Sequence, residues 1–476
     1  GLTKEQLERH APFDTEIPFD AGRKMMTIIR RSPECCFAYS KGAPDVLLKQ
    51  CAARMTLDGT SEPLAETDRA RIADMIASLG QQALRVLAVA HRPLDRQGYR
   101  ADMEVERALV FLGLLAMKDP LRPEAKEAVR TCRNAGIRTV MITGDHKETA
   151  VAIARELGIY REGEAALSGA ELDGMTDHDL TRAVLRVAVY ARVSAEHKLR
   201  IVQAWKRNGA VVAMTGDGVN DAPAIKAADI GVAMGMTGTD VTKEASDMVV
   251  IDDNFASIAA AVEEGRGIFD NIRKTVHFLL SCNLSEVLVM LFAALFGWPL
   301  PLLPIHILWM NLITDGLPAL ALAVDPKAPD LMSQPPRRPE DALLDRTRML
   351  RIASEGLMLA TIGLGAFWMS LFVWGQTTVE ARTVAFTVMV LAQLVHAFNC
   401  RSDWFSLGQL GMRSNAALVW AVLLSLAMQL AVLAVPVVSA IFKVERLPLE
   451  DWELMVALGL LPLAIMEGVK WLRRRT

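Results

Sequence analysis

The sequence predicts two architectures in one chain: an α/β part over about the first 270 residues, and then an all-α bundle of membrane-spanning helices. Two observations support this fold class. Apolar residues are concentrated beyond about residue 275, and the mean hydropathy of +0.25 is too high for an ordinary soluble enzyme of this length. Before that point, β-rich runs alternate with helical segments, which is typical of a parallel sheet covered by helices.

Residues 1–112 are expected to form a partial α+β domain, in which short β-rich runs accompany a polar helix at about 66–80. Residues 113–270 then alternate between strand and helix. Strands are expected at 112–117, 137–142, 187–191, 210–214, 230–234 and 248–251, and helices at 123–135, 147–157 and 195–208. This pattern predicts a doubly wound parallel sheet, which binds ligands at the carboxyl ends of its strands.

Two polar motifs, Thr143-Gly144-Asp145 and Thr215-Gly216-Asp217, fall at such strand ends. The second lies in the string 214–223, which places two carboxylates, an amide and two glycines in one strand-to-helix turn. Asp217 and Asp221 are four residues apart, so both can face one point. Carboxylate oxygens suit Mg²⁺ beside a phosphoryl group. An acidic surface turn would explain Gly-Asp-Gly alone, but not the whole string.

Residues 271–476 are expected to form six transmembrane helices, since six apolar segments are each near the roughly 20 residues that cross a bilayer. They lie at 273–296, 303–324, 350–374, 382–399, 415–441 and 452–471. Lys and Arg are concentrated in the linkers after the second, fourth and sixth segments. The positive-inside rule therefore places the catalytic part and both ends of the chain in the cytosol.

Polar residues inside these spans predict an ion site. Asn283 and Glu286 share one face of the first span, and Asn311, Thr314 and Asp315 share one face of the second. Ionisable groups at this depth are costly and usually functional. Oxygen ligands without thiolate or imidazole favour a hard cation such as Ca²⁺. Hydrogen bonding between helices is the alternative explanation, and it is strongest for polar residues that carry no charge.

Three further features complete the membrane part. Gly316 and Pro318 are expected to interrupt the second span and free backbone carbonyls toward the ion. Gln393 in the fourth span is a weaker candidate for the same cluster. His277, His306 and His396 are expected at helix contacts or interfaces and receive no role.

Charge and cysteine content narrow the function further. A net charge of −3 provides no basic surface, so no nucleic-acid partner is expected. The six cysteines lack a CxxC pair or zinc-type spacing and are expected to be reduced structural thiols. No signal peptide is expected, and the chain, which starts at Gly1, reads as one entered partway through a domain.

Taken together, the motifs resemble the P-type cation-transporting ATPases, most closely the calcium-pump branch, over the family's C-terminal half. The strings that carry the resemblance are Lys41-Gly-Ala-Pro44, Met117-Lys-Asp119-Pro120, Met141-Ile-Thr143-Gly144-Asp145, Thr215-Gly-Asp217-Gly-Val-Asn220-Asp221-Ala-Pro and Leu308-Trp-Met-Asn311-Leu-Ile-Thr314-Asp315-Gly-Leu-Pro. They occur in the order in which the family has them.

The resemblance implies an ATP site and a phosphorylation site. Phe19 would stack on adenine, and the other residues near the nucleotide would be Lys24, Lys41, Gly42, Arg85, Asp145 and Arg192. Residues 113–270 would be the phosphorylation domain, with a haloacid dehalogenase-like fold. Its catalytic residues would be Thr143 and Gly144 on the phosphoryl group, Lys198 neutralising its charge, Asp217 on Mg²⁺, and Asn220 and Asp221 fixing that geometry.

The resemblance also suggests the transported ion. Asn311 and Asp315 lie in a string that looks like the calcium type, and Gln393 stands where a two-calcium pump has a carboxylate. One Ca²⁺ per cycle is therefore expected, and Glu286 leaves room for proton counter-transport. Mn²⁺ remains an alternative because it accepts the same oxygen ligands.

One departure from the family decides how the chain is interpreted. The nucleophilic Asp of Asp-Lys-Thr-Gly-Thr, the actuator motif Thr-Gly-Glu-Ser and the four preceding spans are not in this sequence. We therefore expect the C-terminal part of a pump in the plasma membrane, partnered by lipid and by the missing N-terminal half. The alternatives are a non-catalytic membrane module that regulates a complete pump, and a membrane-tethered phosphatase with Asp119 as its nearest nucleophile.

Overall fold

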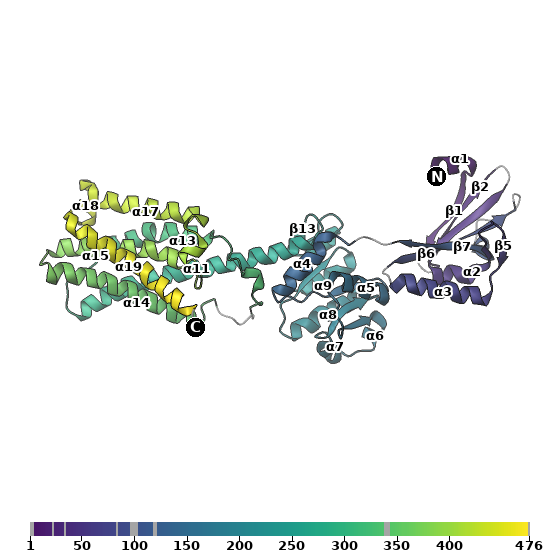
Figure 1. The fold of residues 1–476 in the computed structure, drawn as a ribbon, viewed down its shortest axis with the longest axis horizontal. Coiled ribbons are helices and arrows are strands. Elements are labelled where there is room, and N and C mark those ends of the chain that lie inside the picture. Colours follow the sequence, from purple (N-terminus) through teal and green to yellow (C-terminus); the bar gives the residue numbers. More distant parts are fainter. Residues whose placement is uncertain are drawn as a thin grey trace. The chain divides into compact units, whose positions relative to one another are not determined.

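The structure is a computed structural model that describes residues 4–20, 23–32, 35–81, 84–95, 103–117, 121–337 and 343–474. It divides into two compact units, Gly1–Ala259 and Ala260–Thr476, which are described separately (Figure 1). The motif residue Asp119 lies outside the described residues.

The first unit begins with a seven-stranded sheet in the order β1-β2-β3-β6-β7-β4-β5. Its strands are β1 (Phe13–Asp20), β2 (Met25–Arg31), β3 (Cys36–Gly42), β4 (Cys51–Met55), β5 (Ser61–Pro63), β6 (Arg85–Leu94) and β7 (Leu109–Met117). Its helices are α1 (Lys4–His10), α2 (Pro44–Gln50) and α3 (Glu66–Gln81), with a 3₁₀ turn at Met103–Glu106. Buried residues alternate with less buried ones along β2 and β3, so one face of these strands packs into the core.

Strand β7 corrects one sequence prediction. Residues 112–117 were expected to open the parallel sheet, but β7 runs antiparallel to β6, from Arg85 opposite Met117 to His91 opposite Val110. Its buried residues Leu109 and Phe111 join the core of the first sheet. Periodicity identifies such a run as a strand, but it does not identify the strand's partner.

The rest of the first unit contains parallel strands in two separate three-stranded sheets, ordered β8-β10-β9 and β11-β12-β13. The strands are β8 (Met141–Thr143), β9 (Ala165–Ser168), β10 (Val187–Ala191), β11 (Ala213–Gly216), β12 (Ile230–Met234) and β13 (Met248–Val250). The helices are α4 (Pro123–Asn134), α5 (Lys147–Leu157), α6 (Gly169–Asp173), α7 (Asp177–Ala183), α8 (Ala195–Arg207), α9 (Ala222–Ala227) and α10 (Asp240–Ala245). The sequence predicts a single sheet for this region. The structure instead has two sheets, one containing β8 and the other containing β11.

The two small sheets nevertheless share a core. Ile142 of β8 packs against the cluster formed by Met214 of β11, Val202 of α8 and Ile225 of α9. The motifs that follow β8 and β11 therefore belong to the same compact region.

Six helical segments are long and apolar enough to cross a membrane, and they lie in the second unit except for the start of the first segment, residues 255–259. They are Phe255–Leu295, Pro304–Ala323, Arg346–Val373, Thr378–Asn399, Ala416–Ala434 and Asp451–Arg473. They comprise α11 (Phe255–Leu295), α12 (Pro304–Trp309), α13 (Gly316–Ala323), α14 (Arg346–Trp368), α15 (Thr378–Asn399), α17 (Ala416–Ala434) and α19 (Leu449–Arg473). α15 packs against α14, α17 and α19, and 78% of its most apolar 18-residue stretch is buried. It is therefore the central helix of the bundle (Figure 1).

Two irregularities distinguish these helices from the predicted spans. The predicted segment 415–441 ends as a long helix at Ala434, because Pro436 begins a separate short helix, α18 (Pro436–Phe442). The second span is not broken at Gly316 and Pro318. It carries a π-helical turn over Met310–Thr314, closed by the bond from the Asp315 N–H to the Met310 carbonyl, and it continues as α13.

Candidate functional site

The residues proposed to bind nucleotide gather at one end of the first sheet. Phe19 is the penultimate residue of β1, next to Asp20, which is paired with Met25. Lys41 and Gly42 pair with the start of β2. Arg85 opens β6, three residues before the partner of Gly42. Phe19 is 63% exposed, and Lys24, Lys41 and Arg85 are exposed as well. An aromatic ring and three cations are thus available to a ligand at this end.

Gly42 is required by the close approach of β2. A Cβ atom added there would lie 2.6 Å from the Cβ of Met25 and 2.7 Å from the Lys24 carbonyl oxygen. Lys24 itself has φ of 53°, in a turn closed by its N–H bond of 2.7 Å to the Asp20 carbonyl. Glycine therefore lets the two lysine-bearing segments come together.

The loop after β8 holds Thr143, Gly144 and Asp145. The Thr143 hydroxyl donates to the Asp145 carboxylate at 3.1 Å, and the Asp145 N–H donates back to that hydroxyl at 3.1 Å. Gly144 and Asp145 are exposed. The neighbouring segment adds Arg192, whose N–H bonds to the Asp145 carbonyl at 3.2 Å and whose guanidinium contacts His146.

The loop after β11 is organised around Asp221. This carboxylate is buried at 5% exposure, accepts from the ammonium of Lys198, and accepts at 3.2 Å from each of the backbone N–H groups of Asp217 and Gly218. Asp221 therefore does not face outward beside Asp217, although their spacing of four residues would allow it. Its position instead fixes the loop that presents Asp217, and it holds Lys198 next to that loop.

Asp217 presents an exposed carboxylate on a fixed backbone. Its carbonyl accepts from the Thr239 N–H at 3.0 Å and from the buried Thr242 hydroxyl at 3.3 Å. Among the described residues, none donates a hydrogen bond to its side chain, and nearby Asn220 is also exposed. An exposed carboxylate with a rigid backbone fits a Mg²⁺ ligand that shares the ion with water and phosphate. Nothing in the sequence around Thr239 and Thr242 indicates that these residues hold the backbone of Asp217.

Charge also fixes the helix that follows the Thr143 loop. Lys147, at the start of α5, donates to Glu171 of α6 at 2.9 and 2.8 Å. Hydrogen bonds from Lys147 and from Ser168 lower the pKa of Glu171 to about 2. This ion pair connects α5, which follows β8, to α6, which follows β9.

In the second unit, Glu286 is the centre of a polar cluster. Its two carboxylate oxygens accept from Asn311 Nδ2 at 3.0 Å and from Gln393 Nε2 at 3.2 Å. Thr314, on the same π-helical turn as Asn311, and Asp315, which directly follows that turn, are both fully buried. The structure therefore joins residues from three spans around one carboxylate.

Four buried oxygen atoms in this region have no hydrogen-bond partner among the described residues: Thr314 Oγ1, both carboxylate oxygens of Asp315, and Gln393 Oε1. The Cys282 thiol, which is only a weak donor, lies beside Asp315. Burying such atoms unpaired costs about 1–3 kcal/mol each, and more for a charge. Oxygens kept at this cost are suited to a cation.

Asn283 is not brought into this cluster. It lies on the exposed side of α11, whereas Glu286, three residues on, is buried at 3% exposure. Val287, Leu291 and Leu295 on the same side are also exposed.

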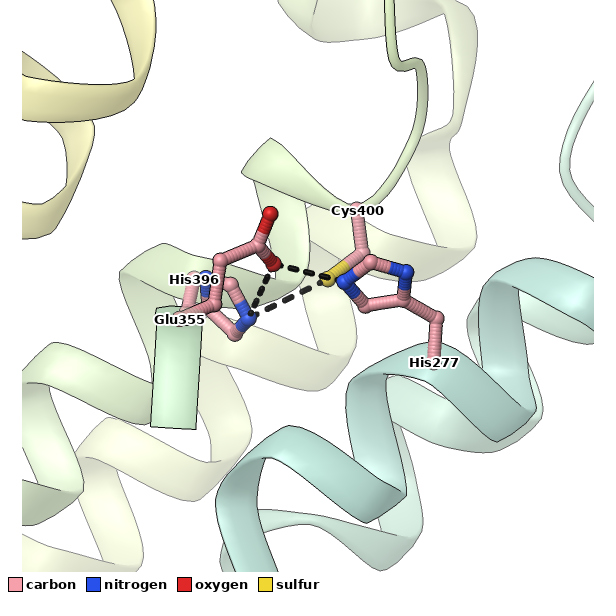
Figure 2. A group of neighbouring side chains, drawn as sticks. All are labelled: His277, Glu355, His396 and Cys400. Carbon is pink, nitrogen blue, oxygen red and sulfur yellow. Dashed lines mark hydrogen bonds and ion pairs between the residues drawn. The ribbon is translucent and has the colours of Figure 1, made fainter. Parts of the chain in front are cut away.

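Sequence reasoning missed a second buried group in this unit, formed by His277, Glu355, His396 and Cys400 (Figure 2). Only the spacing of four between His396 and Cys400 could have indicated it. His306 behaves as expected of a helix contact, since its ring bonds to the Phe442 carbonyl at 2.7 Å and stacks on Phe386.

Comparison with known proteins gives two family matches. Residues 1–124 match "P-type ATPase, cytoplasmic domain N", and residues 299–472 match "Cation transporting ATPase, C-terminus". The chain is 44% identical to a calcium-transporting ATPase of Bacillus subtilis over all of its length and 53% of that protein. It is 43% identical to calcium-transporting ATPase 1 of Bacillus cereus, over 99% of this chain and 54% of the relative. For human calcium-transporting ATPase type 2C member 1 the identity is 39%, over 97% and 48%. The chain thus spans about half the length of these relatives.

Proposed function

The chain belongs to the P-type cation-transporting ATPases, and we propose that it supplies the nucleotide site, the Mg²⁺ loop and part of the ion site of a pump that exports Ca²⁺ from the cytosol. The relatives described above are named as calcium-transporting ATPases. ATP hydrolysis coupled to transport is the activity proposed for the complete pump.

The unpaired oxygens of Thr314, Asp315 and Gln393 carry this proposal. Thr314 and Asp315 lie in the span that also supplies Asn311, and Gln393 lies in α15. Asn311 and Gln393 both bond Glu286 of α11, so carboxylate, hydroxyl and amide oxygens converge without imidazole. Ca²⁺ takes six to eight such ligands, whereas softer ions prefer nitrogen or sulfur. Mn²⁺ is the second candidate ion because it accepts the same donors.

Only two carboxylates, Glu286 and Asp315, belong to this proposed site, since Gln393 is uncharged. Two carboxylates match the charge of one divalent ion. We therefore propose one Ca²⁺ per cycle, with Glu286 as the group that carries a counter-transported proton.

At the phosphorylation site, Lys198 and the Thr143 and Gly144 loop would hold the transferred phosphoryl group. Asp217 would hold Mg²⁺, which neutralises phosphate charge when bound. Asp221 would act as a positioning residue, because it orients Lys198 and the Asp217 backbone together. The exposed cations Lys24, Lys41 and Arg85, together with Phe19, would bind the nucleotide, and Asp145, Arg192 and Asn220 would reach it.

The attacking aspartate would come from a strand between β8 and β11. Within the described ranges, β8 pairs only with β10, and β11 only with β12, although both contribute to one core. An inserted parallel strand would join the two small sheets into the single sheet of a haloacid dehalogenase-like fold. Its carboxyl end would place an aspartate near Thr143 and Asp217 for aspartyl-phosphate formation.

Asn283 and the exposed side of α11 support a further partner in the membrane. An amide facing lipid is unfavourable, and spans contributed by the rest of the pump would cover it. We place the pump in the plasma membrane, with the catalytic unit in the cytosol. A module that only regulates another pump is the second reading, but the complete Asp217 loop favours catalysis.

The test is uptake of radioactive Ca²⁺ into sealed vesicles that contain the complete pump and ATP, with a parallel assay of acid-stable phosphoenzyme. Both signals should be Ca²⁺-dependent. Phosphoenzyme formed only with another cation would reject the ion, and the absence of both signals would support the regulatory reading. Asp315→Asn should keep nucleotide binding and lose the dependence on Ca²⁺.

A further inference from the structure

We propose that His277, Glu355, His396 and Cys400 form a Zn²⁺ site, separate from the Ca²⁺ site, that fastens three membrane helices together. His277 lies on α11, Glu355 on α14 and His396 on α15, and Cys400 directly follows α15. Figure 2 shows the four side chains converging on one point. One ligand atom from each, either nitrogen, oxygen or sulfur, lies within 4.8 Å of all the others.

Two of the distances between ligand atoms match those of a tetrahedral metal site. A tetrahedral Zn²⁺ site with bonds of about 2.0–2.3 Å separates its ligand atoms by roughly 3.3–3.8 Å. His396 Nε2 lies 3.5 Å from Glu355 Oε2 and 3.4 Å from Cys400 Sγ. His277 Nε2 is closer to Glu355 Oε2, at 2.6 Å, because a hydrogen bond joins them. Small side-chain shifts would therefore make room for an ion at the centre.

The donor types select the metal. Imidazole nitrogen and thiolate sulfur suit Zn²⁺ and disfavour Ca²⁺ and Mg²⁺, which take oxygen ligands. The carboxylate and thiolate charges together neutralise Zn²⁺, so the complex is neutral in a weakly polar setting. Zn²⁺ replaces the thiol proton of Cys400 and takes the place of the hydrogen bond between His277 and Glu355. Acid weakens binding because it returns the proton to the thiol.

The site is buried yet reachable. His396 is 0% exposed, His277 4% and Glu355 7%, so water competes little for the ligands. Cys400 is less buried and lines a cavity of about 570 Å³, together with Asp270, Asp325 and Asp403. These acidic residues are paired with Lys274, Arg348 and Arg401 of the same lining, so the cavity gives an ion access to Cys400 without itself attracting a cation.

Binding would act on helices that also carry the proposed Ca²⁺ ligands. His396 is three residues from Gln393, and His277 is nine residues from Glu286, about 13 Å along α11. A metal joining α11, α14 and α15 would restrict their relative movement. Zn²⁺ is thus expected to stabilise the membrane unit without occupying the oxygen cluster.

The test uses the full chain, purified in detergent and stripped of metal with a chelator. Zn²⁺ is titrated against a chromophoric chelator with Ca²⁺ and Mg²⁺ in excess, and Co²⁺ serves as the spectroscopic probe. We expect one Zn²⁺ per chain and a Co²⁺ spectrum with tetrahedral bands and thiolate-to-cobalt charge transfer. A Co²⁺ spectrum of the unmodified chain without the thiolate band would overturn the proposal.

Matched cysteine variants assign the ligand. Cys400→Ser should remove the charge-transfer band and weaken Zn²⁺ binding at least about 100-fold. Cys51→Ser, which removes a buried thiol in the first unit, should change neither. Retention of the band in Cys400→Ser would reject the site.

An alkylation experiment needs no variant and so covers a failure of Cys400→Ser to fold. Zn²⁺ should slow modification of Cys400, located by mass spectrometry, at least about tenfold. Cys35, a partly exposed thiol in the first unit, should react at the same rate with and without the metal. Equal rates at Cys400 would contradict the proposal.

Discussion

Lys198 donates to the carboxylate of Asp221, and this ion pair joins α8 to the loop that follows β11. The second oxygen of the carboxylate accepts the N–H groups of Asp217 and Gly218. One buried carboxylate therefore sets the place of a cation and of an exposed acid that belong to different elements. This arrangement can hold fixed charges around a phosphoryl group, and it needs no proton transfer to do so.

Asp221→Asn tests this positioning role. The loss of one charged partner leaves Lys198 partly buried, with a side-chain exposure of 19%, and should destabilise the first unit by about 1–3 kcal/mol. Phosphoenzyme formation by the complete pump should fall about 100-fold or more. Glu127→Gln, which breaks an exposed ion pair with Arg130, is the control and should change stability by less than about 0.5 kcal/mol. Similar thermal melts for both variants would contradict the role of Asp221.

Asp217→Asn should separate chemistry from folding. The Asp217 side chain is exposed, and its backbone makes the contacts that hold the loop, so the melting temperature should stay within about 2 °C. Phosphoenzyme formation with Mg²⁺ and ATP should be lost in the complete pump, because an amide is a poor Mg²⁺ ligand. Normal phosphorylation at ordinary Mg²⁺ concentration would reject the assignment.

Two glycines in the same loop make a matched pair. A Cβ at position 216 would lie 2.5 Å from the Asp221 Cβ, whereas a Cβ at position 218 would meet Asp221 Oδ2 at an ordinary 3.6 Å. Gly216→Ala should therefore displace Asp221 and cost about 1–3 kcal/mol, and Gly218→Ala should cost much less. Thermal unfolding of the two variants measures the difference, and equal costs would show that Asp221 tolerates displacement.

Glu171 gives the first unit a dependence on acid. Its pKa is lowered to about 2 from 4.5 by the Lys147 and Ser168 hydrogen bonds. A lowered pKa contributes stability above the unfolded value of 4.5, which is lost as the pH falls toward about 2. The carboxylate is largely exposed, so the contribution is below about 1 kcal/mol. The melting difference between the unmodified protein and Glu171→Gln should shrink between about pH 6 and about pH 3. A constant difference would mean that the pairing is not electrostatic.

The sequence predicted local structure well where one element carries the signal. The strand Val187–Ala191 and the helix Lys147–Leu157 have the expected bounds, and the six spans lie where hydropathy places them. Contacts between distant segments could not be predicted. The pairing of β7 with β6 depends on a ladder of backbone bonds, and alternation alone does not specify a partner.

The candidate sites show the same limit. Spacing placed Asp217 and Asp221 in one turn, but only the structure shows that Asp221 turns toward Lys198. Helical periodicity placed Asn283 beside Glu286, yet the packing of α11 leaves Asn283 exposed. The His277–Glu355 contact joins residues 78 positions apart, and neither residue has a neighbour in sequence that indicates a partner.

Gln393→Glu tests the proposed stoichiometry of one Ca²⁺. The Gln393 amide donates to Glu286, so a carboxylate at position 393 would face Glu286 directly and repel it. Without Ca²⁺ the variant should therefore melt at a lower temperature than the unmodified pump, and Ca²⁺ should restore more stability because a third carboxylate adds charge to the site. Bound Ca²⁺ per phosphoenzyme, counted by radioactive Ca²⁺ in the complete pump, should rise from one toward two. Gln429→Glu, which alters a buried glutamine that bonds Trp309 instead, is the control and should leave the count at one. A count of two in the unmodified pump would reject the single site, and an unchanged count of one in Gln393→Glu would remove Gln393 from the determinants of stoichiometry.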